Sequence, residues 1–154
     1  MDMAILLKPE AIRVVGTFSS KKRLFQDLGE LVEPVYGIDA DTAVEALQER
    51  ESLGSTGVGH GVALPHARLE SLDKVVGAFI RLERPFHYGS VDKAPVDLIF
   101  ALFAPRGSGV EHLKALAYVS RTLRDARVCA KLRANSDPAT LHAILASSAD
   151  SKAA

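Results

Sequence analysis

Residues 96–104 read VDLIFALFA, a nearly unbroken apolar run that begins directly after Pro95. A second run, VVGAFIRL, covers residues 75–82. Short apolar runs bounded by Pro and Gly are typical of strands that are covered on both faces. The two runs therefore predict the central strands of a sheet that is buried between layers of helices.

Helical patterns surround these two runs. The apolar residues of 20–32 recur at helical spacing behind the possible caps Ser19 and Ser20, and Asp39 can cap a second helix that ends before Gly54. Three more helices are expected after residue 104, and they begin near Gly109, Asp125 and Pro138. Helices before, between and after the strands predict an α/β domain with helices packed on a mixed β-sheet.

The length of 154 residues predicts one domain, residues 1–154. A chain of this size buries enough surface to need neither disulfides nor a metal for its core. The polar residues 147–154 are expected to form a disordered tail.

Charge and cysteine content exclude several classes of function. Lys plus Arg and Asp plus Glu both number 19, so the formal net charge is zero. This balance argues against a general nucleic-acid binder and against bulk attraction to an anionic membrane. The single cysteine, Cys129, allows no intrachain disulfide and no cysteine-based metal cluster, and its setting among apolar residues predicts a buried side chain.

No segment of the sequence predicts membrane insertion. The N-terminal apolar run, residues 3–7, is shorter than the core of a signal peptide, and no run approaches the ~20 residues of a membrane span. The expected location is the cytoplasm.

The stretch GSTGVGHGVALPH, residues 54–66, is rich in glycine. A phosphate-binding P-loop needs Lys and Ser or Thr after its last glycine, but Val62 and Ala63 follow Gly61. The dinucleotide pattern G-x-G-x-x-G also fails, because Val62 stands where its third glycine belongs. The stretch remains either a flexible loop that leads into a short strand or a functional loop.

Pro65 and His66 favour the functional interpretation. The proline fixes the chain direction immediately before an imidazole, at the end of an expected strand over residues 62–64. A neutral imidazole nitrogen is a good nucleophile near pH 7 and can carry a phosphoryl group. Glycine-loop N–H groups, the hydroxyls of Ser55 and Thr56, and nearby Arg and His side chains can surround such a group.

These residues carry a resemblance to a known family. The segments RESLGSTGVG (50–59), VALPH (62–66) and PVDLIFAL (95–102), followed by His112-Leu113 and Leu132-Arg133, stand in the same order and spacing as in the family. The chain resembles the IIA component of the bacterial phosphoenolpyruvate phosphotransferase system, fructose–mannitol class (type 2), and within it the nitrogen-regulatory branch. The resemblance implies the mannitol-type IIA fold, a mixed β-sheet flanked by helices on both faces.

The resemblance also implies the site residues. His66 follows the proline of the family motif and is the expected phosphohistidine, modified at Nε2. Arg50 and His112 match the family's active-site arginine and second histidine. The expected phosphoryl loop comprises Gly54, Ser55, Thr56, Gly57, Gly59 and His60. His60 stands where Asn is frequent in the nitrogen branch, and Ala67 stands where Gly is frequent.

The implied function is that of a phosphotransferase component, a phosphohistidine carrier rather than a conventional turnover enzyme. The implied donor is a histidine phosphocarrier protein. The implied outputs are regulatory targets such as potassium transport or sensor components, or, as the alternative, a IIB protein of a fructose- or mannitol-type uptake system. No cofactor, metal, nucleic acid or membrane insertion is expected.

The remaining histidines and the basic residues near the C-terminus have less specific interpretations. His60 is interpreted as a loop residue near the site without essential chemistry, His87 as a turn residue, and His142 as solvated. No His-Glu-x-x-His spacing indicates a metal site. Basic residues between 121 and 133 are interpreted first as a solvated helix face and second as a docking surface for an acidic partner.

Overall fold

The two apolar runs form the long antiparallel pair at the centre of the sheet. They are β5 (Val76–Phe86) and β6 (Val96–Pro105), paired with Ile80 opposite Ile99. Their central side chains, including Phe79 and Phe100, are fully buried. The computed structural model describes the backbone of residues 1–153 and the side chains of residues 1–148.

Shorter strands extend the sheet on both sides. β1 (Ile12–Val15) lies parallel to β5, while β3 (Val62–Ala63) and β4 (His66–Leu69) both lie parallel to β6. β2 (Gly57–Gly59) adds to β3 in the antiparallel direction. The path runs β1-β5-β6-β3-β2, with β4 also on β6, so the sheet is mixed as the sequence predicts.

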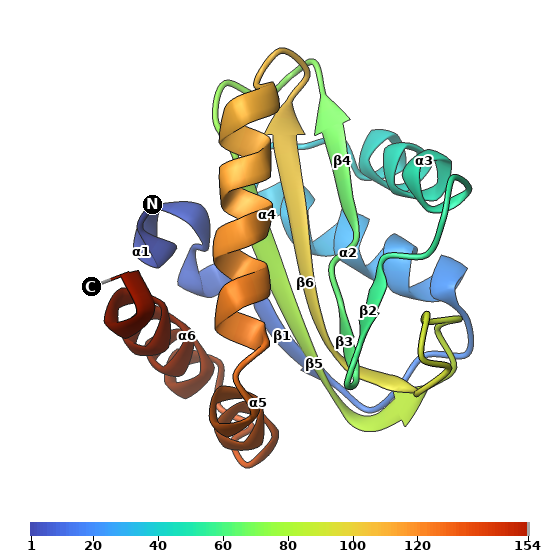
Figure 1. Cartoon of the computed structure of the whole chain (residues 1–154). Helices are drawn as coiled ribbons and strands as arrows, with labels where there is room; N and C mark the ends of the chain where they lie inside the picture. The colour runs from blue at the N-terminus through green and yellow to red at the C-terminus, as the bar shows by residue number, and fades with distance from the viewer. Residues whose placement is uncertain (154) are drawn as a thin grey trace.

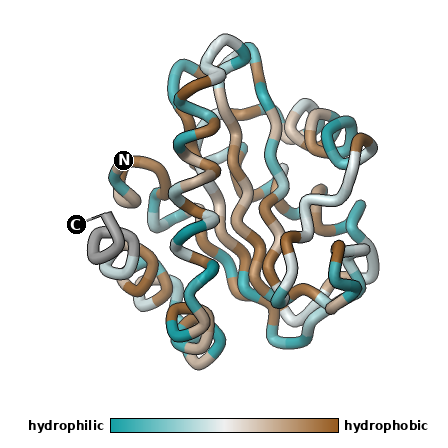
Figure 2. The backbone as a smooth tube through the Cα atoms, viewed as in Figure 1, coloured by the Kyte–Doolittle hydropathy of each residue, from teal (hydrophilic) through white to brown (hydrophobic). Residues whose placement is uncertain are grey.

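Helices cover both faces of this sheet (Figure 1). α2 (Lys21–Tyr36) crosses one face and packs against α3 (Ala40–Glu51), which lies beside β4. α4 (Gly109–Leu123) follows β6 on the opposite face and leads into α5 (Ala126–Arg133). Hydrophobic residues concentrate along the strands between these layers (Figure 2).

The ends of the described chain lie side by side (Figure 1). α1 (Met3–Leu6) and a 3-10 turn (Pro9–Ala11) precede β1, and α6 (Pro138–Ala153) packs beside α1 and β1. His142 Nε2 lies 2.8 Å from the carbonyl oxygen of Leu7. The prediction that His142 is solvated is therefore wrong, because this half-buried ring joins α6 to the N-terminal segment.

Helix boundaries follow local capping. Ser20, Asp39 and Asp125 each cap a helix by accepting a hydrogen bond from a backbone N–H of its first turn, as their positions in the sequence predict. α6 begins at Pro138 and runs through Ala153, so residues 147–153 are helical where a tail was predicted. Ala154 lies outside the described residues. No helix of the described chain is long and apolar enough to cross a membrane.

Pro65 lies between β3 and β4, immediately before His66. β3 and β4 share a continuous register along β6, with Ala63 opposite Ile99 and His66 opposite Leu102. Pro65 has no N–H to give to this ladder, although its carbonyl oxygen still accepts from Leu102 N at 3.0 Å. His66 therefore begins β4 at a break in the hydrogen bonding of a buried sheet.

Gly29 permits close packing of α2 on α3. A Cβ at this position would lie 2.8 Å from the carbonyl oxygen of Ala40 and 2.9 Å from Val44 Cγ2. We expect Gly29→Val to lower the free energy of unfolding by about 2 kcal/mol, because overpacking forces the two helices apart. Urea denaturation measures the change. Gly107→Val is the matched control, since no atom lies within 4 Å of its Cβ position, and an equal loss in both variants would contradict the packing argument.

Candidate functional site

His66 is held in one tautomer by the backbone. Its Nδ1 lies 2.8 Å from the carbonyl oxygen of Leu64, which accepts hydrogen bonds only. Nδ1 therefore carries the proton of the neutral ring, and the lone pair lies on Nε2. Burial lowers the pKa of His66, against the effect of the Leu64 carbonyl, and the charges of Arg50 and Arg68 lower it further. The ring is thus neutral at pH 7, with Nε2 available as a nucleophile.

Arg50 approaches that same nitrogen from the last turn of α3. Its Nε donates to His66 Nε2 at 3.3 Å, and its Nη1 donates to the carbonyl oxygen of Gly54 at 3.0 Å. The second contact ties the guanidinium to the turn that follows the helix. A guanidinium in this position places fixed N–H donors around any anion that forms on Nε2.

His112 lies against His66 from the first turn of α4. The two rings meet edge to face, with centroids 5.3 Å apart. Arg68 Nε donates to His112 Nδ1 at 3.2 Å, so the proton of the neutral His112 ring lies on Nε2. Within the described residues this buried Nε2 has no hydrogen-bond partner. His112 therefore has an N–H donor ready for an additional acceptor in the site.

The electrostatics of the pair follow from this geometry. Burial, together with the nearby His66 and Arg68, lowers the pKa of His112 to about 4. At neutral pH both rings are uncharged and hold opposite tautomers. One ring presents a lone pair and the other presents an N–H.

These groups surround one cavity of about 350 Å³. Its charged and polar lining comprises three arginines, one carboxylate and both histidines, namely Arg50, Arg68, Arg106, Glu49, His66 and His112. Arg106 also pairs with Glu70 at the surface, at 3.5 Å. The cavity has the charge and the donors to hold a doubly charged tetrahedral group.

A buried network supports the glycine-rich turn. Glu51 accepts from Lys21 Nζ at 2.8 Å, and from the amide and hydroxyl of Thr56 at 2.9 and 2.5 Å. Tyr88 also contacts the Thr56 hydroxyl, at 2.7 Å. Burial opposes ionisation of Glu51, but the hydrogen bonds from Lys21 and Thr56 outweigh it and lower its pKa. The charged carboxylate fixes the turn whose Gly54 carbonyl holds Arg50.

The predicted loop residues separate into two groups. Gly54 contacts Arg50, and Ser55 and Thr56 line a cavity of about 340 Å³ that also includes His66. The Thr56 hydroxyl is hydrogen-bonded to Glu51 and Tyr88, so it stabilises the turn and does not face the open cavity as a free donor.

Gly57 and Gly59 belong to β2, where the absence of a side chain allows the local backbone conformation and packing. A Cβ at Gly57 would collide with Ser90, and Gly59 has a φ of 100° beside Asp92. His60 lies away from both cavities that His66 lines. It occupies the β2–β3 turn at a φ of 57°, where its N–H donates to Asp92 and its carbonyl accepts from Arg133.

We did not predict Arg68, Arg106 or Glu51 from the sequence. Arg68 could have been found, because residues two apart on a strand share a face and His66 begins β4. Glu51 could not, since its partners Lys21 and Tyr88 are distant in the chain. Among the described residues no group of three or more His, Cys, Asp or Glu side chains is placed to hold a metal ion.

Comparison with known proteins identifies the class to which this fold and site belong. The family model "Phosphoenolpyruvate-dependent sugar phosphotransferase system, EIIA 2" matches residues 5–148. The chain therefore belongs to the EIIA type 2 family, and the resemblance drawn from the sequence is confirmed.

Within the family the chain is a homologue of nitrogen regulatory proteins. It is 44% identical over 146 residues to that of Bradyrhizobium diazoefficiens, covering 95% of each chain. It is 35% identical to that of Escherichia coli K12, covering 94% of this chain and 90% of the relative.

Solved structures confirm the fold. The nitrogen regulatory protein IIA-Ntr from Neisseria meningitidis matches with a TM-score of 0.87 and 35% identity, over 93% of this chain and 98% of that one. IIA mannitol from Escherichia coli matches with a TM-score of 0.73 at 22% identity, over 89% and 96%. The expected mannitol-type fold, a mixed sheet with helices on both faces, is thus confirmed.

We expect the two site histidines to show opposite tautomers in solution. Long-range ¹H–¹⁵N spectra at pH 7.5 will show His66 protonated at Nδ1 and His112 protonated at Nε2, because Leu64 O accepts from one ring and Arg68 Nε donates to the other. Arg68→Gln removes the guanidinium, so the His112 ring will become a mixture of tautomers while His66 stays unchanged. Identical tautomers in the two rings of the wild-type protein would contradict this geometry.

Folding stability should depend on pH through His112. Its folded pKa of about 4 lies below the ordinary 6.5, so the unfolded chain binds more protons between these values and stability falls as the pH drops. Between pH 7 and pH 5, we expect the unfolding free energy of the wild type to fall by on the order of 2 kcal/mol more than that of His112→Gln. Urea denaturation at both pH values measures this difference. Equal losses in the variant and the wild type would show that His112 does not titrate this way.

Proposed function

We propose that this chain is a phosphoryl carrier that accepts its phosphoryl group on Nε2 of His66 from a histidine phosphocarrier protein. The observation that carries the proposal is the hydrogen bond from His66 Nδ1 to the Leu64 carbonyl, which leaves the Nε2 lone pair facing a cavity lined by arginines. Membership in the EIIA type 2 family supports the same reaction class.

The transfer step uses groups already in place. The Nε2 lone pair attacks the phosphorus of the donor's phosphohistidine, the donor's N–P bond breaks, and its electron pair returns to the donor ring. The proton of His66 stays on Nδ1, where the Leu64 carbonyl stabilises the positive charge that develops on the ring. No proton has to leave His66 during the step.

Arg50 and His112 take complementary parts. The Nε–H of Arg50 gives up its hydrogen bond to His66 Nε2 and donates to the phosphoryl oxygens instead, while Nη1 of Arg50 remains near Gly54. His112 donates its Nε2–H to one of these oxygens, and Arg68 keeps that proton on the correct nitrogen. Arg68 is therefore a positioning residue for His112. Such prearranged donors stabilise charge that spreads over the phosphoryl oxygens in the transition state.

The output of the carrier is regulatory. A phosphoryl group brings about two negative charges to a cavity whose lining carries three arginines and Glu49, and so cancels most of its positive charge. Leu53, Val110 and Leu113 stand exposed near this cavity, in the α3–β2 turn and the first turns of α4. A target that packs on these apolar residues would meet a different charge in each state. The similarity to nitrogen regulatory proteins favours this output.

The phosphorylation assay is the direct test. Labelling from a phosphorylated histidine phosphocarrier will be lost in His66→Gln. Transfer to Arg50→Ala will be about 100-fold slower, because a charged donor to the phosphoryl oxygens is missing. Arg121→Ala, an exposed change in the last turn of α4, is the matched control and will transfer at the wild-type rate. Undiminished labelling of His66→Gln would exclude this histidine as the carrier.

The same phosphorylated protein distinguishes regulation from sugar uptake. The solved complex of mannitol IIA with phosphorylated mannitol IIB shares the fold at 22% identity, which leaves IIB transfer as the alternative output. Incubation with a purified fructose-type IIB protein should move little phosphate compared with return to the phosphocarrier. Rapid and complete transfer to IIB would favour the alternative.

A further inference from the structure

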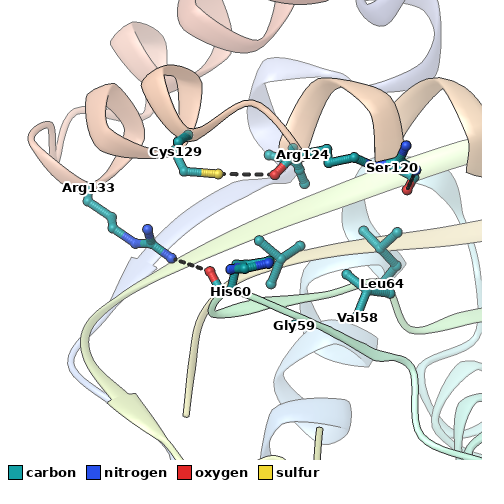
Figure 3. Close-up of a pocket in the computed structure, with 11 residues that line it drawn as sticks. Val58, Gly59, His60, Leu64, Ser120, Arg124, Cys129 and Arg133 are labelled. Atoms are coloured by element: carbon teal, nitrogen blue, oxygen red, sulfur yellow. Dashed lines mark hydrogen bonds between the residues drawn. The ribbon is translucent and has the colours of Figure 1, made fainter. Parts of the chain in front are cut away.

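A second cavity, larger than the phosphoryl site, lies between the β2–β3 hairpin and the junction of α4 and α5. Its volume is about 530 Å³, within the range of small-molecule sites. Figure 3 shows His60 and Val58 on one side, with Arg124, Cys129 and Arg133 from the α4–α5 region on the other. The proposed phosphoryl chemistry uses neither His60, Arg124 nor Arg133.

Part of the lining of this cavity is apolar. Five of its eleven lining residues have side chains without polar atoms, namely Val58, Val62, Leu64, Leu123 and Ala126. The thiol of Cys129 is buried and donates to the carbonyl oxygen of Leu123, so it presents little polarity to the cavity. An occupant therefore needs an apolar portion of comparable size.

The charged residues that line the cavity are both arginines. Its eleven lining residues include Arg124 and Arg133 but no carboxylate. Arg133 is bound by Asp97, with contacts of 2.9 to 3.1 Å, so most of its charge is compensated. Arg124 instead reaches Ser120 Oγ at 3.3 Å, and none of the ion pairs found among the described side chains includes it. One guanidinium is thus available for one negative charge.

We infer that this cavity binds a small organic carboxylate with an apolar body, with the carboxylate on Arg124 and the apolar portion against Val62, Leu64 and Leu123. A monocarboxylate matches the one lining guanidinium that has no ion pair among the described side chains, whereas a dianion would leave one charge without a partner. A planar carboxylate also suits the two-pronged donor geometry of arginine.

The site is separate from His66 but shares a wall with it. Leu64, Val58 and Ser120 line this cavity and also the adjoining cavity that contains His66. The carbonyl oxygen of Leu64 holds His66 Nδ1, while its side chain contacts the apolar space on the other side. Binding at the second site requires no phosphoryl group and no His66 ring, so the inference stands apart from the proposed function.

The test is an NMR titration of the full chain with 3-phenylpropionate. We expect a dissociation constant below about 1 mM, with shifted backbone amides at Gly59, His60, Arg124 and Cys129. 3-Phenylpropan-1-ol, which has the same apolar body without the charge, should bind at least about fivefold more weakly. Inorganic phosphate, which is charged but has no apolar portion, should leave the chemical shifts of these amides unchanged.

Variants locate the binding. Arg124→Gln should weaken the affinity for 3-phenylpropionate about fivefold, whereas Arg121→Gln, the matched control on the same helix, should change it less than twofold. Ala126→Phe, a change at an exposed position of the lining, should abolish binding by filling the cavity. His66→Gln should bind like the wild type, which separates this result from the outcome of the phosphorylation assay. Amide dispersion in each spectrum confirms folding.

Three results would overturn the inference. They are equal affinity for the alcohol, an affinity that Arg124→Gln and Arg121→Gln change alike, and amide shifts centred on His66 and His112.

Discussion

The hydrogen bond between His66 Nδ1 and the Leu64 carbonyl oxygen determines what the rest of the site can do. It selects the tautomer, and with it the nitrogen that faces the arginines. The carbonyl is available because the backbone of Leu64 faces away from β6: its N–H donates to the carbonyl oxygen of Thr56, whereas the neighbouring Pro65 carbonyl accepts from Leu102 of β6. β6 holds the segments on both sides of Leu64 in one register, which fixes the position of this carbonyl relative to the imidazole.

Around this bond, each side chain of the site depends on a neighbour for its position or its tautomer. Arg50 depends on the Gly54 carbonyl, and the turn that contains Gly54 depends on the buried Glu51 carboxylate. His112 depends on Arg68 for its tautomer. Lys21, from the start of α2, compensates the charge of Glu51. Three separate helices, α2, α3 and α4, and the strand β4 therefore contribute to the surroundings of one imidazole. Side chains held in this way need little rearrangement when charge develops.

Sequence patterns predicted the parts of the molecule that depend on local physics. Continuous apolar runs identified β5 and β6, because two-sided burial removes the usual alternation. β1 escaped prediction because Ile12–Val15 is only four residues long and its side chains are mostly half-buried. The structure gathers Arg50, His66 and His112 at one cavity, and the roles that the family resemblance implies for them stay a prediction. The interpretation of His142 failed because its partner, the Leu7 carbonyl, lies 135 residues away, beyond the reach of any local pattern.

The pairing of each imidazole with an arginine also affects whether the two rings can bind a metal ion. Two histidine rings with centroids 5.3 Å apart would ordinarily attract copper, nickel or zinc, which bind through the lone pairs of neutral imidazoles. Here Arg50 Nε–H occupies the lone pair of His66, and Arg68 Nε–H occupies that of His112. A divalent cation would have to displace two guanidinium groups and then remain within their repulsive field. The two arginines therefore disfavour binding of a divalent metal ion at this pair of imidazoles.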